Sequence, residues 1–154
     1  MKRLISILVV ILLSVVNVTA QEVWFECDVT KVSTQFNQKR TELSEEGGYV
    51  IIPANKYKNR GSKGLLIYHY IFGNEYFAFE IECQECKHFG KHSTVHMKTN
   101  ILCRCETCSS EFQNVSHGSA QQTNGTGEFW LKQYNCYLEG NKLIVTNQIL
   151  KSKL

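Results

Sequence analysis

The sequence predicts an all-β, antiparallel fold, and two features carry that prediction. Short apolar runs are separated by turns that contain glycine or asparagine, which is the pattern of strands and hairpins. Apolar residues at helical spacing are scarce, and the chain has one proline. In the first apolar run, Val23, Phe25, Cys27 and Val29 alternate with more polar neighbours, as expected of a half-buried strand.

The clearest strand signal is a hairpin in the middle of the chain. Residues 65–71 and 76–81 form two apolar runs, and Gly73-Asn74 between them favours a tight turn. Further strands are predicted at residues 49–53, 129–134 and 143–146, with a turn at 139–141. The polar stretch 31–46 fits either a loop or a short helix, and the sequence does not decide between them.

The N-terminus has the features of a secretory signal peptide. Lys2 and Arg3 are followed by a nearly continuous apolar stretch, residues 4–16, and then by small residues at 18–20. We therefore expect a signal peptide at 1–20 and one mature β domain at 21–154, exported to the periplasm or secreted. An uncleaved anchor is the alternative. No later stretch is apolar enough to predict a membrane span.

The charge balance argues against two classes of partner. The formal net charge is +3, and removing Lys2 and Arg3 leaves +1. Such a near-neutral domain has no electrostatic basis for binding nucleic acid or an anionic membrane. No nucleophile elbow, H-E-x-x-H or phosphate loop occurs in the chain, so we do not expect an enzyme.

The seven cysteines include two C-x-x-C motifs. Cys83 and Cys86 form the first, Cys105 and Cys108 form the second, and 18 residues separate Cys86 from Cys105. Two such turns on neighbouring hairpins can complete a tetrahedral sulfur site for zinc or for an iron–sulfur centre. The alternative is a set of two or three disulfides, because export leads to an oxidising compartment.

Three stretches between residues 60 and 147 match the pattern of a known family. The first is Gly64-Leu65-Leu66-Ile67-Tyr68, then Tyr76-Phe77-Ala78-Phe79-Glu80, before Cys83. The second is Cys105-Glu106-Thr107-Cys108-Ser109-Ser110-Glu111-Phe112, then Gly118; the third runs over residues 131–134 and 140–147. Together they resemble small exported bacterial Rieske-type domains. The resemblance implies a Rieske-like antiparallel β-sandwich whose two cysteine-bearing loops hold a [2Fe–2S] cluster.

The chain departs from that family at the ligands. The family uses one cysteine and one histidine in each loop, whereas Cys108 stands at the second histidine position. In the first loop, either Cys83 or Cys86 aligns with the family's cysteine, and the second register makes His88 a ligand. The two ligand sets are therefore Cys83, Cys86, Cys105 and Cys108, or Cys86, His88, Cys105 and Cys108. The resemblance also assigns Ser110 a hydrogen bond to the cluster, unless it is an ordinary turn serine.

These observations leave three functional hypotheses. The first is an exported Rieske-like protein that binds a cluster or metal and passes electrons to an unknown redox or surface partner. The second replaces the cluster with structural zinc, and the third with disulfides; either gives a structural or binding module. The signal lacks a twin-arginine pair, so the chain is expected to cross the membrane unfolded, which disfavours a cluster inserted beforehand.

Two weaker patterns complete the list of candidates. His88, His92 and His96 are spaced four residues apart and would share one face of a helix, although a histidine-rich polar loop is the commoner explanation. Cys27 and Cys136 lie in the predicted flanking strands, where a disulfide could join the first strand to the last hairpin.

Overall fold

A computed structural model describes residues 21–36, 39–56, 63–113 and 115–151. The predicted signal peptide, residues 1–20, lies outside this part of the chain. None of the helices in the described ranges has the length and hydrophobicity that a bilayer crossing requires.

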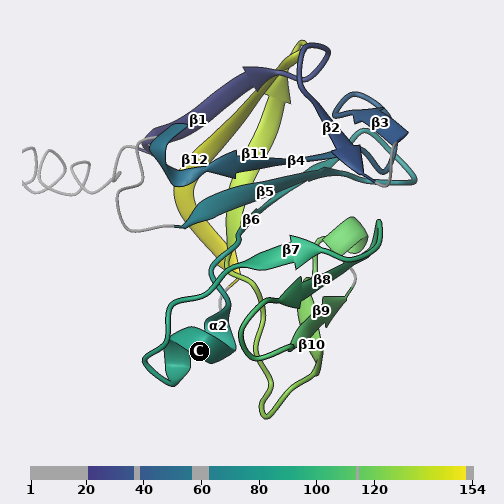
Figure 1. Cartoon of the computed structure of the whole chain (residues 1–154). Coiled ribbons are helices and arrows are strands. Elements are labelled where there is room, and N and C mark those ends of the chain that lie inside the picture. Colours follow the sequence, from purple (N-terminus) through teal and green to yellow (C-terminus); the bar gives the residue numbers. More distant parts are fainter. Residues whose placement is uncertain (1–20, 37–38, 57–62, 114, 152–154) are drawn as a thin grey trace, which may run out of the picture.

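The larger sheet has six antiparallel strands and curls into a half-barrel (Figure 1). Its ladder begins with the first strand of the chain, which pairs with the last one. The strands in spatial order are β1 (Val23–Asp28), β12 (Lys142–Lys151), β11 (Gln133–Glu139), β6 (Tyr76–Glu80), β5 (Gly64–His69) and β4 (Tyr49–Pro53).

A second, smaller sheet lies beside the half-barrel together with a short helix (Figure 1). Its strands in spatial order are β10 (Gln121–Asn124), β9 (Glu111–Gln113), β8 (Leu102–Cys105) and β7 (Val95–Met97). The helix, α2 (Gln84–His88), follows β6 directly. A separate hairpin and two 3₁₀ turns complete the structure: β2 (Ser33–Phe36), β3 (Lys39–Glu42), η1 (Ala54–Lys56) and η2 (Val115–His117).

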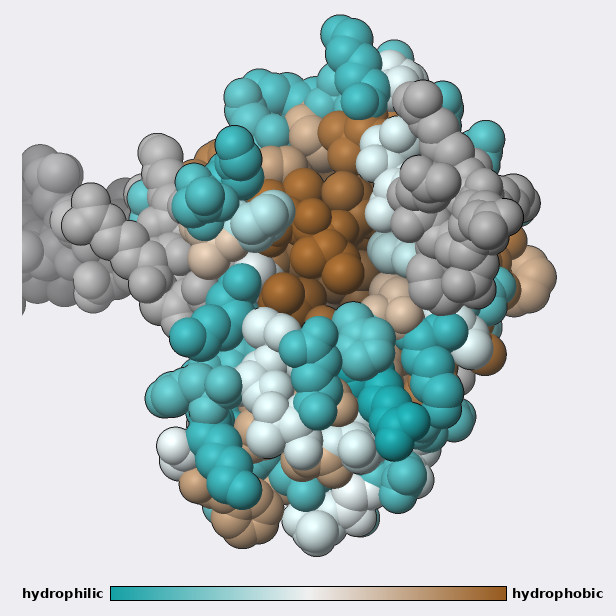
Figure 2. Space-filling view, viewed as in Figure 1, coloured by the Kyte–Doolittle hydropathy of each residue, from teal (hydrophilic) through white to brown (hydrophobic). Residues whose placement is uncertain are grey.

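Strand β5 is buried on both faces, which explains its unbroken apolar sequence. Leu66 and Tyr68 face a core shared with the smaller sheet, where they join Phe79 and Phe112. Leu65 and its same-face neighbours belong to a second core inside the half-barrel. The sheet thus separates two hydrophobic cores, and Figure 2 shows hydrophobic residues in the hollow of the half-barrel above a mostly polar lower half.

One buried carboxylate is held between the strands of the half-barrel. Glu80 is buried on β6 and accepts a hydrogen bond of 2.9 Å from Tyr134 Oη. Lys132 Nζ lies 3.1 Å from the same carboxylate oxygen. The charge is therefore paired and hydrogen-bonded, as burial requires.

The all-β, antiparallel prediction is confirmed, including the hairpin of β5 and β6 and the last turn between β11 and β12. The undecided stretch 31–46 contains the β2–β3 hairpin rather than a helix. The predicted strand at 129–134 begins later, at Gln133.

The considered disulfide between Cys27 and Cys136 is wrong for this fold. Strand β12 lies between β1 and β11, so the two cysteines sit two strand spacings apart. Two spacings of about 4.8 Å exceed the roughly 7 Å limit on the Cα separation of a disulfide. Both cysteines are free, and Cys136 Sγ instead donates a hydrogen bond of 3.0 Å to the Tyr76 carbonyl.

Replacing Phe79 tests the core that the two sheets share. Phe79 is 0% exposed, so Phe79→Ala leaves a cavity and should lower the free energy of unfolding by about 3–5 kcal/mol. The matched control is Phe72→Ala, since Phe72 is 72% exposed. Urea denaturation should give a change below about 1 kcal/mol for the control. Equal losses for both variants would contradict the shared core.

Candidate metal centre

The first pair of cysteines is positioned by the start of α2. Cys83 is the N-cap residue of the helix, and its Sγ accepts a hydrogen bond of 3.5 Å from the backbone N–H of Cys86. The Cys83 N–H donates to the Ser93 carbonyl at 2.9 Å, which ties the start of the helix to the strand leading into β7. One helical turn then returns Cys86 to the side of Cys83.

The second pair lies in the turn between β8 and β9. Cys105 ends β8, and its N–H donates to the Ser110 carbonyl at 2.9 Å, which closes the turn. Ser109 has φ of 62°, a left-handed conformation that reverses the chain after Cys108. The Thr107 N–H donates to Cys105 Sγ at 3.4 Å. The local backbone thus aims both cysteines at α2.

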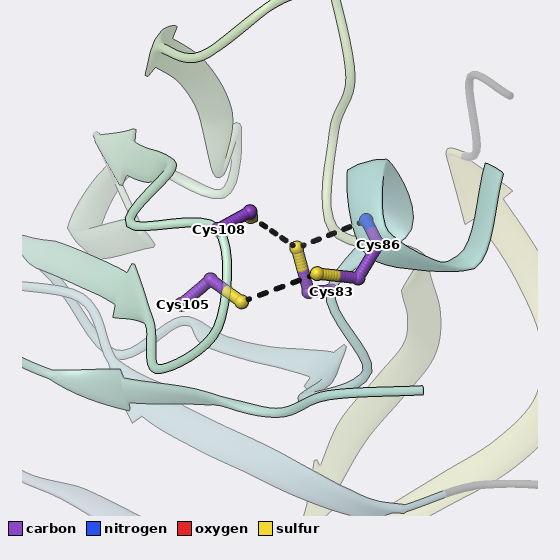
Figure 3. Close-up of side chains that lie close together, drawn as sticks. All are labelled: Cys83, Cys86, Cys105 and Cys108. Atoms are coloured by element: carbon purple, nitrogen blue, oxygen red, sulfur yellow. Dashed lines mark hydrogen bonds between the residues drawn. The ribbon is translucent and has the colours of Figure 1, made fainter. Parts of the chain in front are cut away.

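The four sulfurs of these pairs converge on one point (Figure 3). All four Sγ atoms lie within 4.8 Å of one another. Cys83 Sγ lies 3.6 Å from Cys108 Sγ, and Cys86 Sγ lies 3.6 Å from Cys105 Sγ. Zn–S bonds of about 2.3 Å would place the corners of a tetrahedron about 3.8 Å apart. The four-cysteine group therefore matches the size of a site for one metal ion.

Burial and hydrogen bonding give the thiols different acidities. Burial raises the pKa of Cys83, and it raises the pKa of Cys86 to about 12 with help from the neighbouring cysteines. Burial acts in the same direction on Cys105, but hydrogen bonds from Ser93 and from backbone N–H groups outweigh it and lower the pKa of Cys105 to about 7. Cys105 is thus the most acidic of the three thiols and the readiest to bind a metal ion as a thiolate.

Two serines contact the sulfurs from outside the group. Ser110 Oγ lies 2.9 Å from Cys108 Sγ, and its hydroxyl donates to the carboxylate of Glu85. Ser93 Oγ lies 3.4 Å from Cys105 Sγ and accepts a hydrogen bond of 2.7 Å from Thr107 Oγ1. Such outer contacts orient metal ligands and tune their basicity.

His88 lies outside the four-cysteine group. It is the last residue of α2, and its ring packs near those of Phe89 and Phe129, with centroid distances of 5.0 and 5.4 Å. His92 contacts Glu82 at 2.9 Å, whereas His96 lies 3.7 Å from an exposed carboxylate on another turn. The three histidines belong to a helix, a loop and a strand, so they do not share one helix face.

Sequence reasoning missed the contacts of Ser93 and the burial of Glu85 at this site. Glu85 lies between Cys83 and Cys86 and is 4% exposed. Burial favours the neutral acid, but hydrogen bonds from Ser110 and Thr126 outweigh it and hold the pKa of Glu85 below its usual value. A glutamate between two cysteines gives no signal of burial, because the same residue would be equally suitable on a solvated turn.

The raised pKa values predict a steep pH dependence of metal binding. Cys83 and Cys86 are protonated at neutral pH and must each lose a proton to become ligands. The affinity for Zn²⁺, used as a probe ion, should therefore rise at least about 100-fold per pH unit between pH 6 and 8. Competition with a chelator of known pH dependence measures this slope, and a slope below two protons would contradict the assignment.

Replacing His88 separates the two ligand sets. Because its ring packs outside the four-cysteine group, His88→Ala should leave the amount of bound metal unchanged. Cys83→Ser should remove a ligand and weaken binding by more than the roughly 10–100-fold typical of an outer contact. Elemental analysis of both purified variants gives the answer, and metal loss in His88→Ala alone would favour the set that contains His88.

Comparison with known proteins leaves the geometry as the basis for interpretation. No family model matches the chain, and no curated protein or solved structure matches it. The resemblance to Rieske-type domains therefore stays an expectation drawn from the sequence. What the fold provides directly is a four-cysteine group that could hold a metal ion.

Proposed function

We propose that the four-cysteine group binds a single zinc ion, and that the protein is an exported, zinc-stabilised β module. The observation that carries this proposal is the mutual distance of at most 4.8 Å among all four Sγ atoms. Structural zinc sites take four such ligands in a closed tetrahedron. A two-iron cluster places each pair of thiolates on its own iron, which calls for a more extended arrangement.

Charge and the export route also support zinc. Four thiolates around a divalent ion carry a net charge of −2, and the buried, hydrogen-bonded carboxylate of Glu85 adds negative charge beside Cys86. Added negative charge disfavours taking up an electron, whereas zinc has no redox chemistry to impair. A chain that crosses a membrane unfolded can bind zinc afterwards, when its turns come together.

The proposed role of the ion is to join segments distant in sequence. One pair of ligands begins α2 and the other lies between β8 and β9, so the ion would attach the helix after β6 to the smaller sheet. Structural zinc contributes about 10–16 kcal/mol of apparent binding free energy in small domains. With all four positions taken by sulfur, no position remains for a substrate or an activated water, so we propose no catalysis at the ion.

A Rieske-like redox centre is the second candidate, and the position of Ser110 Oγ beside Cys108 Sγ favours it. The hydroxyl donates to Glu85, and turning its proton toward the sulfur would give the kind of hydrogen bond that sets the reduction potential of iron–sulfur centres. On this alternative the protein is an electron-transfer accessory for an unidentified redox or surface partner. With four thiolate ligands, its potential would lie well below that of a centre with two histidines.

Metal and thiol analysis of protein made through its own export route tests these alternatives. We expect a colourless protein with one zinc ion, four protected thiols and loss of structure around α2 and the smaller sheet under chelation. Cys105→Ser should lose the ion, while the matched control Cys27→Ser should keep it, since Cys27 lies in the half-barrel core. Iron with acid-labile sulfide would establish the redox alternative instead. Metal-free protein with oxidised Cys83, Cys86, Cys105 and Cys108 would establish disulfides.

A further inference from the structure

The carboxylate of Glu85 accepts four hydrogen bonds. Three come from residues 122–126 and one comes from Ser110, in the second cysteine turn. The carboxylate accepts bonds from Thr126 Oγ1 at 2.7 Å and from the Thr126 N–H at 3.2 Å. Gln122 Nε2 donates to its other oxygen. Ser110 Oγ donates to that same oxygen at 2.5 Å. No cation contributes to this set of bonds, so polar donors alone stabilise the buried charge.

Three of these bonds come from residues 122–126, here called the strap. The strap comprises the last three residues of β10 and the two that follow, and its bonds to Glu85 attach it to α2. Gly125 has φ of 149°, and a Cβ there would collide with Glu85 Oε2 and Gln122 Nε2. The close approach of the strap to the carboxylate therefore depends on glycine at this position.

The fourth bond connects the strap to a metal ligand. Ser110 Oγ contacts Cys108 Sγ at 2.9 Å as well as Glu85, so a continuous chain of polar contacts runs from Thr126 to Cys108. Cys108 is also the ligand of the four that is partly exposed, whereas Cys83, Cys86 and Cys105 are buried. The exposed side of the centre is thus the side that this chain of contacts reaches.

We propose that Glu85 is a positioning residue that ties the strap to the exposed side of the four-cysteine group, and that this tie controls how fast the centre exchanges its metal ion. The proposal rests on the metal-binding function proposed above. Glu85 is not a ligand; it acts through Ser110 and through the strap. The strap would hold α2 against the second cysteine turn, so that an attacking chelator cannot displace Cys108 first.

The test compares wild type with Glu85→Ala, Glu85→Gln and Gly125→Ala. We expect chelator-driven zinc release to be at least tenfold faster in Glu85→Ala and Gly125→Ala, and intermediate in Glu85→Gln, whose amide still accepts from Thr126. The cobalt-loaded variants should keep tetrahedral thiolate spectra, with a shifted sulfur-to-cobalt band where the Ser110 contact is altered. Thr126→Val, which keeps the backbone donor, should give a smaller increase in release and guards against a misfolded glycine variant.

Two controls match these changes elsewhere in the chain. Glu139→Gln removes an exposed carboxylate at the β11–β12 turn, and Thr123→Ala changes an exposed strap side chain for which no contact to Glu85 is present. Both should release zinc at the wild-type rate. Wild-type release rates in Glu85→Ala and Gly125→Ala, or faster release in the two controls as well, would overturn the proposal.

A metal-independent measurement keeps the proposal apart from the proposed zinc function. Because the Thr126 N–H donates to Glu85, its hydrogen exchange should be slow in wild type and at least tenfold faster in Glu85→Ala. Alkylation of Cys108, measured on each reduced protein as isolated and without added chelator, should accelerate in the same variant. If wild-type protein binds no metal, the proposed zinc function is wrong. Unchanged hydrogen exchange at Thr126 and unchanged alkylation of Cys108 in Glu85→Ala would contradict the proposed tie between the strap and Glu85, whether or not metal binds.

Discussion

The convergence of four sulfur atoms from two short turns is the constraint on which the lower half of the molecule depends. For Cys86 to meet Cys105, the chain must leave β6, turn once through α2 and return alongside the start of the smaller sheet. The isolated bridge between Glu82 and Thr94 and the bond from Cys83 to Ser93 align these segments. The smaller sheet is held in place by apolar contacts of residues such as Val95, Met97 and Phe112. The sulfur group and its outer contacts add to this packing.

The half-barrel explains why the upper half needs no such centre. Its strands bury one face inside the curl, and β5 and β6 bury the other face against the smaller sheet. Phe79 and Phe112 connect the two sheets through apolar contact, while the paired charge of Glu80 connects β6 to β11 and Lys132. The molecule thus has two hydrophobic cores, one inside the half-barrel and one between the two sheets, and the four-cysteine group packs in the second.

The strands of the larger sheet could be predicted from the sequence, because apolar runs and turn residues are local signals; the hairpin of β5 and β6 is an example. The strands of the smaller sheet, β7 to β10, are three or four residues long and were not predicted. The β2–β3 hairpin could not be predicted, since its residues are polar and lack alternation. The burial of Glu85 could not be predicted from the sequence either, because it depends on Gln122 and Thr126, which lie close to it only in the folded chain. The position of His88 depended on the helical turn of α2, which motif spacing does not specify.

The pairing of β1 with β12 has a consequence for how the protein acquires its structure. Gln21 and Thr146 are joined by a side-chain hydrogen bond although they lie 125 positions apart along the chain. Because β1 pairs with β12, the half-barrel cannot form strand by strand while the chain is still emerging from a ribosome or a translocation pore. Contacts of such long range make assembly slow and cooperative. The described sheet therefore closes only once β12 is available, and until then β1 offers an unpaired edge.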